Sequence, residues 1–149
     1  MRKRIFLICV LVFGLTIAAL AQKTVVNNAR AKTMLLGRHR LSLQWISWDY
    51  FGTATVTNRG GTFYLKGEQR RRSGTDFVKI DGRITEINAR DFKFDGSIIT
   101  QVKDINGGKP CTRDGEMSFK ITGTRKYWRL AEMDNPCEAV TDYVDIFFK

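Results

Sequence analysis

The sequence predicts an all-β fold, either a single antiparallel β-barrel of about eight strands or a strongly coiled β-sandwich, which follows a cleaved signal peptide. Three observations predict this class. Segments in which polar and apolar residues alternate, as they do in half-buried strands, recur along the chain. Turn residues separate these segments, and the longest two each carry a glycine where a bend in the sheet would fall. Only residues 25–36 have apolar residues at a spacing that fits a helix, and this helix would be short.

The alternating segments are distributed over the whole chain after the signal. A turn cluster at residues 58–61, Asn-Arg-Gly-Gly, separates two of them and predicts a hairpin. Pro110 and Pro136 are the only prolines, and each directly precedes a cysteine in a predicted loop. Apart from one longer hairpin, the predicted strands are 40–45, 53–57, 62–65, 117–121, 127–130 and 143–148.

The longer hairpin spans residues 78–102. It contains two Asp-Gly pairs, which locally are a strong signal for tight turns. If the chain turns instead at residues 88–90, antiparallel pairing places Gly82 opposite Gly96 and separates apolar from charged side chains, as a sheet with one wet face requires. We therefore interpret the two glycines as a mid-strand bend. The apolar face then carries Val78, Ile80, Ile84, Phe92, Phe94, Ile98 and Val102.

A weak internal repeat extends this interpretation. Apolar residues stand four and two positions before each of four glycines, which are 15, 14 and 27 residues apart. This spacing fits a meander of similar strands in which each glycine stands at one height, although chance alternation would give a similar pattern. The predicted structural glycines are Gly67, Gly82, Gly96 and Gly123.

In strand count and alternation this architecture resembles the lipocalin and related calycin barrels. The resemblance implies an eight-stranded barrel with a mouth wide enough for one small ligand. The Gly-x-Trp signature of the first lipocalin strand is absent, because the chain has Gln-Trp-Ile-Ser-Trp at residues 44–48. No functional residue is therefore carried over from that family.

Residues 1–21 have the features of a signal peptide. A basic start at residues 2–4 precedes an almost wholly apolar run, and Ala19-Leu20-Ala21 supplies the small residues that signal peptidase needs. An uncleaved membrane anchor is the alternative, since the apolar run is near the lower limit for a span. Cleavage before Gln22 predicts a secreted or periplasmic protein with no transmembrane span.

The mature chain is expected to form one monomeric unit. Residues 22–37 are an N-terminal extension that holds the candidate helix, and residues 38–149 are the antiparallel β domain. After loss of the signal the chain keeps two cysteines, Cys111 and Cys137, and an even count in an exported chain predicts a disulfide. A reactive thiol is the alternative, but no C-x-x-C motif is present.

The chain is basic, with a net charge of +10, of which three positive charges lie in the signal. The remaining excess favours a small amphipathic or anionic molecule, or an acidic component of the cell envelope, as partner. Export argues against nucleic acid. A solvated basic surface with no specific partner is the simpler interpretation of the same charge.

Catalysis has little support in the sequence, and no catalytic residue, metal site or cofactor is predicted. His39 is the only histidine and stands between two arginines, so neither a Ser-His-acid set nor a His/Cys metal cluster can be assembled. A metal site made of carboxylates alone or a glycosidase pair is the alternative, but we expect the acidic residues near the end of the chain to form a solvated loop and strand. They are Asp134, Glu138, Asp142 and Asp145.

The candidate recognition residues are aromatic and basic. By alternation Trp45 belongs to the buried face of its strand, whereas Trp48 and Tyr50 could line a ligand mouth or cap the end of the barrel. The predicted hairpin tip at residues 70–75 carries three guanidinium groups, which suit carboxylate or phosphate. These groups belong to Arg70, Arg71 and Arg72.

The first functional hypothesis is a non-enzymatic exported barrel that binds a small amphipathic or anionic ligand in its mouth. The second is a structural or protein-interaction module of the envelope with a filled core and no ligand. An open cavity of about 300 Å3 or more would favour the first, and a filled interior would favour the second. A small outer-membrane barrel, with its apolar face toward lipid, is a third and weaker alternative. The side chains expected to fill an interior are Trp45, Phe92, Phe94 and Phe119.

Overall fold

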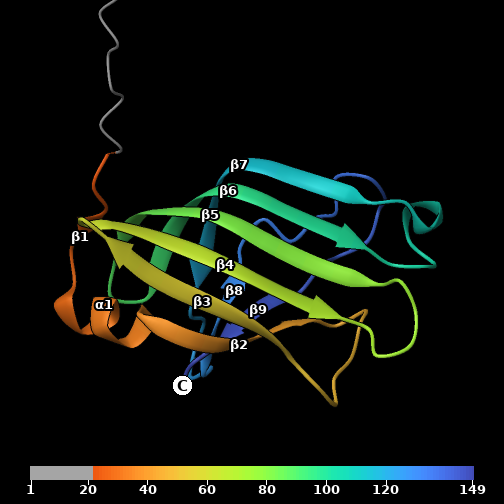
Figure 1. Ribbon diagram of the computed structural model, residues 1–149, viewed down its shortest axis with the longest axis horizontal. Helices are drawn as coiled ribbons and strands as arrows, with labels where there is room; N and C mark the ends of the chain where they lie inside the picture. The colour runs from red at the N-terminus through yellow and green to blue at the C-terminus, as the bar shows by residue number, and fades with distance from the viewer. Residues whose placement is uncertain (1–21) are drawn as a thin grey trace, which may run out of the picture.

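The computed structural model describes residues 22–149 and shows a closed antiparallel β-barrel (Figure 1). Each strand of the meander pairs with the next, and the last strand returns to the first, which closes the sheet. The predicted eight-stranded barrel is thus confirmed, and the sandwich alternative is not. The predicted signal peptide lies outside the described residues. The barrel strands are β2 (Gly37–Leu43), β3 (Gly52–Arg59), β4 (Thr62–Arg70), β5 (Phe77–Ile87), β6 (Asp91–Gln101), β7 (Cys111–Lys120), β8 (Tyr127–Leu130) and β9 (Val144–Phe147).

The N-terminal extension is built into the barrel. A two-residue strand, β1 (Val25–Val26), adds parallel to the end of β5, and the helix α1 (Ala29–Leu35) follows at one end of the barrel (Figure 1). The Asn28 side chain accepts a hydrogen bond from the Ala31 amide (2.8 Å), which caps the helix. Ala31 and Leu35 belong to the buried core. The helix predicted within residues 25–36 is therefore confined to residues 29–35, because Val25 and Val26 form the strand β1 instead.

Residues 22–149 contain one helical turn besides α1. A single 3-10 turn, η1 (Asn106–Gly108), lies between β6 and β7. Within residues 22–149, no helix has the length and apolar character needed to cross a membrane.

The long hairpin has the register that the sequence predicts. Gly82 lies opposite Gly96, and the turn falls between Ile87 and Asp91. A bulge between Ile84 and Glu86 then shifts the pairing by one residue near the turn. The seven apolar residues predicted for one face are all buried.

The glycine pair is required by close packing. A Cβ atom built on Gly82 would lie 2.6 Å from the Cα atom of Gly96 and 2.7 Å from a ring carbon of Phe94. The Phe94 ring therefore covers both glycines from inside the barrel, and no larger residue fits at either position. Gly115 on β7 pairs with Gly96 and extends the row to three strands.

Two of the four predicted structural glycines do not stand at the height of the other two, although glycine is required at Gly67 as well, where a Cβ atom would lie 2.8 Å from the Ala54 Cα atom. Gly67 pairs with Ala54 and Ile80, so it lies outside the row of Gly82 and Gly96. Gly123 lies beyond β7 in a turn, with φ of 59°. The repeat pattern missed Gly115 because Arg113 stands where the pattern requires an apolar residue.

The interior of the barrel is filled with aromatic and aliphatic side chains. Phe92, Phe94 and Phe119 have no exposed surface, and the rings of Phe92 and Phe119 stack at a centroid distance of 5.0 Å. Trp128 packs edge-on against Phe92 at 6.0 Å. These packed side chains show the filled interior that the sequence analysis gave as the mark of its second functional hypothesis.

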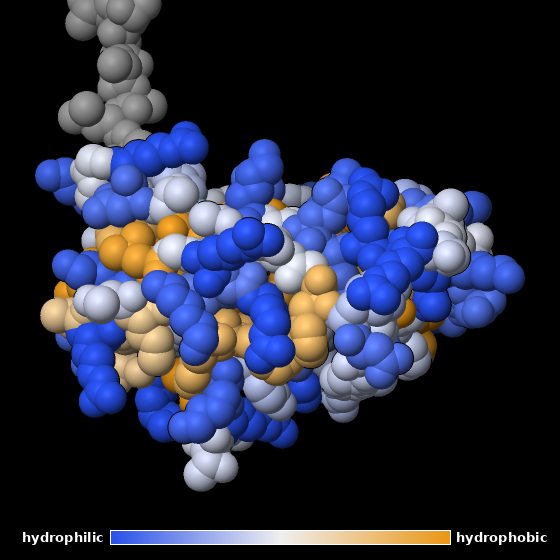
Figure 2. Space-filling view, turned by 60° about the horizontal axis from the view of Figure 1, so that its bottom comes forward, coloured by the Kyte–Doolittle hydropathy of each residue, from blue (hydrophilic) through white to orange (hydrophobic). Residues whose placement is uncertain are grey.

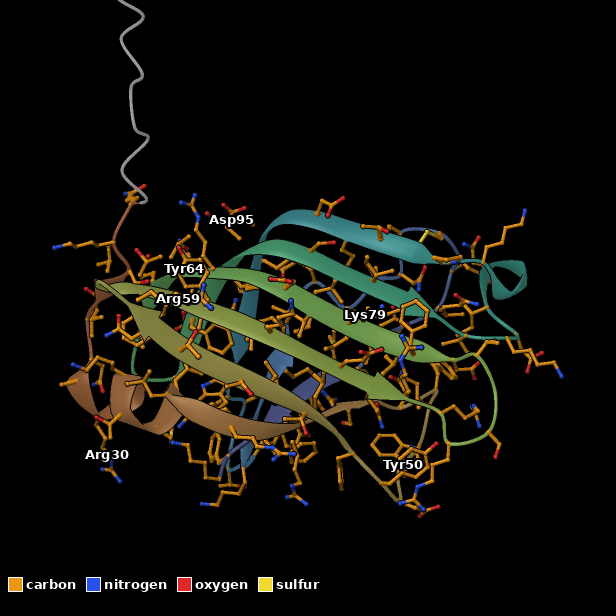
Figure 3. The ribbon with its side chains drawn as sticks, in the orientation of Figure 1. Arg30, Tyr50, Arg59, Tyr64, Lys79 and Asp95 are labelled. Carbon is orange, nitrogen blue, oxygen red and sulfur yellow. A yellow bond between two sulfur atoms is a disulfide. The ribbon has the colours of Figure 1, made fainter. Side chains whose placement is uncertain are left out.

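The outside of the barrel is charged where the inside is apolar. On β5 and β6 the outward positions include Lys79, Asp81 and Asp95, of which Figure 3 labels Lys79 and Asp95 on the outer surface. Transmembrane barrels have the reverse arrangement, with apolar residues facing outward to lipid. The outer surface of β5 and β6 is therefore the opposite of what the outer-membrane alternative requires.

Trp45 does not fill the interior, which corrects the expectation from alternation. Strand β2 ends at Leu43, so Trp45 stands in the following turn and is 38% exposed, and Ile46 is buried in its place. The tryptophan of the interior is Trp128, on the short strand β8.

Cys111 and Cys137 form a disulfide with an Sγ–Sγ distance of 2.07 Å. The bridge joins the first residue of β7 to the loop that leads into β9, 26 residues later. We expect the double replacement of both cysteines by serine to lower the free energy of unfolding by about 3 kcal/mol, because the loop is no longer closed in the unfolded chain. Urea denaturation of the oxidised protein and of the variant measures this difference.

Alkylation provides a chemical check on the same bridge. Because Cys111 is buried, the reaction must be run in denaturant without reductant. Neither cysteine of the mature protein should then react, and both should react once reductant is added. Alkylation of both cysteines before reduction would contradict the bridge.

Candidate functional site

A groove of about 930 Å3 runs along the outside of the barrel, and we call it the basic groove. It lies on the side that carries β2, which is turned forward in Figure 2, where hydrophilic side chains surround smaller apolar areas. Its basic residues come from four separate segments. They are Arg38 and Arg40 of β2, Arg72 of the β4–β5 loop, Lys126 of the β7–β8 loop and Lys149 after β9, and its aromatic residues are Tyr50, Phe51, Phe147 and Phe148.

Aromatic rings hold two of the guanidinium groups. The Arg40 guanidinium lies 4.6 Å from the ring centroid of Phe51 and 5.1 Å from that of Phe147. The Arg72 guanidinium lies 4.4 Å from the ring centroid of Tyr50, and the Arg72 amide donates to the Tyr50 hydroxyl (3.0 Å). Such contacts orient a guanidinium without using its N–H donors, which stay available for an anion.

No acidic side chain lines the basic groove. Arg38 donates to the hydroxyl of Thr53 (3.1 Å), and none of the five basic residues forms an ion pair within the described chain. Seven of the 15 acids pair with cations outside the groove, and none lines it, so positive charge is concentrated there. The ion pairs of residues 22–149 are Lys66–Asp81, Arg70–Glu68, Arg71–Asp76, Arg83–Asp95, Lys93–Glu86, Arg113–Asp142 and Arg129–Asp145.

His39 lies beneath the groove and is only 3% exposed. Alternation along β2 directs Arg38 and Arg40 outward and His39 inward. Its Nε2 atom is 2.7 Å from the Leu35 carbonyl oxygen, and its Nδ1 atom is 2.9 Å from the Phe147 carbonyl oxygen. A neutral imidazole has one N–H and can donate to only one of these oxygens at a time. His39 thus lies between the end of α1 and β9, with a carbonyl oxygen of each within hydrogen-bonding distance of its ring.

The arginine triplet predicted as one anion site is divided by the fold. Arg70 pairs with Glu68, and Arg71 donates to Asp76 (2.7 Å) and to the Trp45 carbonyl (2.8 Å). Only Arg72 reaches the basic groove. The three guanidinium groups separate because β4 ends at Arg70 and the chain then turns.

Of the three aromatic candidates, only Tyr50 lines the groove. Trp45 donates from Nε1 to an Asp142 carboxylate oxygen (3.0 Å), which gives it a structural contact. Trp48 is 62% exposed in the β2–β3 loop and lies outside the groove.

The acidic residues near the end of the chain divide into two classes. Asp134 and Glu138 are exposed, as expected of a solvated loop, but Asp142 and Asp145 are buried, which corrects the expectation for these two. Asp145 accepts two hydrogen bonds of 2.7 Å from Arg129. These bonds raise the pKa of Arg129 above its ordinary value, although burial acts in the opposite direction. Within residues 22–149, His, Cys, Asp and Glu side chains do not gather into a metal-binding group.

Most residues of the basic groove could not be predicted from local sequence patterns. The outward position of Arg38 and Arg40 follows from alternation in β2. The contribution of Phe147 does not, because it depends on the pairing of β9 with β2 across the closure of the barrel.

Comparisons with known proteins place the chain in a family. An uncharacterized protein of Pasteurella multocida (strain Pm70), PM1083, is 46% identical over 120 residues, which cover 80% of this chain and 77% of that protein. No solved structure matches the chain significantly. The model of the PM1083 family matches residues 23–148, nearly the whole of the barrel and its N-terminal segment. The chain therefore belongs to the PM1083 family.

Proposed function

We propose that the protein is an exported, non-enzymatic β-barrel that binds a small anionic or amphipathic molecule in the basic groove on its outer surface. One observation carries the proposal: five basic and four aromatic residues line one groove of small-ligand size that contains no acidic side chain. The ligand site thus moves from the barrel mouth, where the sequence analysis expected it, to the outside.

The chemistry of the groove fits a ligand with an anionic head and an apolar part. Arg40 and Arg72 present guanidinium donors in the forked geometry that suits phosphate, sulfate or carboxylate. Phe148 offers apolar surface in the same groove. A catalytic role has no comparable support, because the ring nitrogens of His39 face backbone carbonyls.

Export is part of the proposal. It is supported by the apolar run and Ala-Leu-Ala ending of residues 1–21 and by the disulfide between Cys111 and Cys137. Together these two features support the proposal of a secreted or periplasmic location.

Dodecyl phosphate, below its micelle concentration, is a suitable probe because it combines an anionic head with an alkyl chain. We expect the double variant Arg40→Gln/Arg72→Gln to bind it about tenfold more weakly than the wild type in titration calorimetry, because charge-assisted hydrogen bonds to the head are lost. Dodecyl maltoside, which has the same chain and a neutral head, should bind weakly to both proteins.

Arg59→Gln is the matched control. Arg59 lies over the ring of Tyr64 at 5.3 Å, as Arg72 lies over Tyr50, but outside the groove (Figure 3). It should bind dodecyl phosphate as the wild type does. An equal loss in Arg59→Gln, or no binding by the wild type, would contradict a site in the basic groove.

A structural or protein-interaction module is the second candidate. The filled interior favours it, as does Trp48, an exposed tryptophan in the β2–β3 loop. Native mass spectrometry of protein purified from its own cell envelope separates the two candidates. A reproducibly bound small anion supports the ligand-binding protein. Protein that carries no ligand and also fails to bind dodecyl phosphate supports the structural or protein-interaction module.

A further inference from the structure

A second groove, of about 530 Å3, adjoins the basic groove, and we call it the helix groove. It lies between α1, the β5–β6 turn and the β7–β8 turn. Lys126 and Phe148 line both grooves, so the two are direct neighbours that share these side chains. In Figure 3 Arg30 of the helix groove and Tyr50 of the basic groove stand at the two ends of the lower side of the barrel.

The helix groove is also basic. Arg30, Arg90, Arg125 and the shared Lys126 line it, and it contains no acidic side chain. Arg90 donates to the carbonyl oxygens of Ile121 (3.2 Å) and Gly123 (2.6 Å), so it also holds the β7–β8 turn in place. Together the two grooves carry eight different basic residues, none of which forms an ion pair within the described part of the chain.

A backbone hydrogen bond holds together the two residues that the grooves share, Lys126 and Phe148. The Phe148 amide donates to the Lys126 carbonyl oxygen (2.9 Å), which fixes the residues after β9 against the β7–β8 loop. Basic residues therefore follow one another from Arg72 through Lys126 to Arg30 along two adjoining grooves. A small anion would occupy only part of this length.

We propose that the two grooves form one continuous binding track for a linear acidic polysaccharide. The inference rests on the proposed function, since one end of the track is the basic groove. Eight cations in series suit a chain that carries repeated sulfate or carboxylate groups, because each group can meet a different cation.

Two observations favour a polysaccharide over other polyanions. Single-stranded nucleic acid binds through bases stacked on open aromatic faces, but Arg40 and Arg72 already cover the rings of Phe51 and Tyr50. An anionic lipid surface is met by cations that project toward it, whereas these cations line hollows. A sulfated or uronic acid chain needs neither stacking nor a flat contact.

The test uses heparin oligosaccharides of increasing length, from the disaccharide upward, titrated into the mature, oxidised protein. We expect affinity to rise with length until a chain covers both grooves, and then to level off. The variant Arg30→Gln/Arg125→Gln should lose about tenfold in affinity for long chains and keep wild-type binding of dodecyl phosphate. Its plot of log affinity against log salt concentration should be shallower by about one for each cation removed.

Lys79→Gln/Arg59→Gln is the control of equal charge, with both cations outside the two grooves (Figure 3). Its affinity for long chains should fall far less than that of Arg30→Gln/Arg125→Gln. Equal losses in the two double variants would show a general charge effect and would overturn the track. Thermal unfolding of each variant confirms that it is folded.

The two proposals can fail separately. If dodecyl phosphate binds through Arg40 and Arg72 but affinity for heparin does not depend on length or on Arg30 and Arg125, the track is wrong and the proposed function stands. If dodecyl phosphate binding does not depend on Arg40 and Arg72, the proposed function fails, and the track fails with it. Single-stranded DNA or anionic vesicles that bind as tightly as long heparin, with the same dependence on Arg30 and Arg125, would overturn the assignment to a polysaccharide.

Discussion

Replacing Arg113 with alanine should lower the free energy of unfolding by about 3–5 kcal/mol, because it leaves a buried carboxylate without its cation. The Arg113 and Asp142 side chains are 8% and 1% exposed, and their Nη2 and Oδ2 atoms are 2.9 Å apart. Arg113 also donates to the Asp134 carbonyl oxygen (2.9 Å), so the same side chain ties β7 to the loop that precedes β9. Urea denaturation followed by tryptophan fluorescence measures the loss.

Asp142 keeps two donors in this variant. Trp45 Nε1 (3.0 Å) and Asn135 Nδ2 (2.9 Å) still reach its carboxylate, which places the expected loss toward the lower end of the range. Hydrogen bonds from neutral groups reduce the cost of the buried charge but do not neutralise it.

Two comparisons isolate the effect of burial. Arg83→Ala breaks the Arg83–Asp95 pair, in which both side chains are more than a third exposed, and should cost no more than about 1 kcal/mol. The double variant Arg113→Met/Asp142→Leu removes both charges and should regain part of the stability that Arg113→Ala loses, because the unpaired charge is gone but Trp45 Nε1 and Asn135 Nδ2 lose their acceptor. If Arg113→Ala cost no more than Arg83→Ala, the pair would not have the buried role that its exposure indicates.

The β5–β6 hairpin shows what could be predicted from the sequence. Its register depends on residues close together in the chain, and a slip of one residue would turn every apolar side chain to the wrong face. The opposition of Gly82 and Gly96 and the inward position of Phe94 could therefore be counted directly, and the structure confirms both.

Trp45 shows where alternation fails. The pattern of β2 continues past Leu43, but the strand itself does not. The Gln44 side chain accepts from the Tyr143 amide (2.7 Å) and donates to the Thr141 carbonyl oxygen (2.6 Å). These contacts lie almost a hundred residues away in sequence, so no local pattern could place the end of the strand.

The basic groove could not be predicted from the sequence either, because it too depends on contacts between distant parts of the chain. Arg40 and Phe147 are 107 residues apart in the chain and meet only because β9 pairs with β2 to close the barrel. The three arginines at residues 70–72 were the clearest local signal for an anion site. Two of them, Arg70 and Arg71, instead form ion pairs with nearby acids. The composition shows an excess of basic residues, whereas only the topology shows where on the molecule they gather.

Replacing Phe94 with alanine should lower the free energy of unfolding by about 3–5 kcal/mol, since it removes a fully buried ring and leaves a cavity. Phe94 packs edge-on against Phe119 at a centroid distance of 6.2 Å and covers the Gly82–Gly96 pair. The two glycines have no side chains with which to fill the space, so the backbone would border an empty volume. Denaturation with urea gives the difference.

Phe77→Ala is the matched control, because Phe77 is a phenylalanine only half-buried on the outside of the barrel, against Arg70 and Lys79. It should cost clearly less than Phe94→Ala. Benzene should also bind to Phe94→Ala and not to the wild type, because a dry apolar cavity accepts such a ligand and a filled interior does not. Equal losses in the two variants, or benzene binding by the wild type, would mean that the interior is loosely packed. Such a result would favour the original hypothesis that the ligand binds inside the barrel.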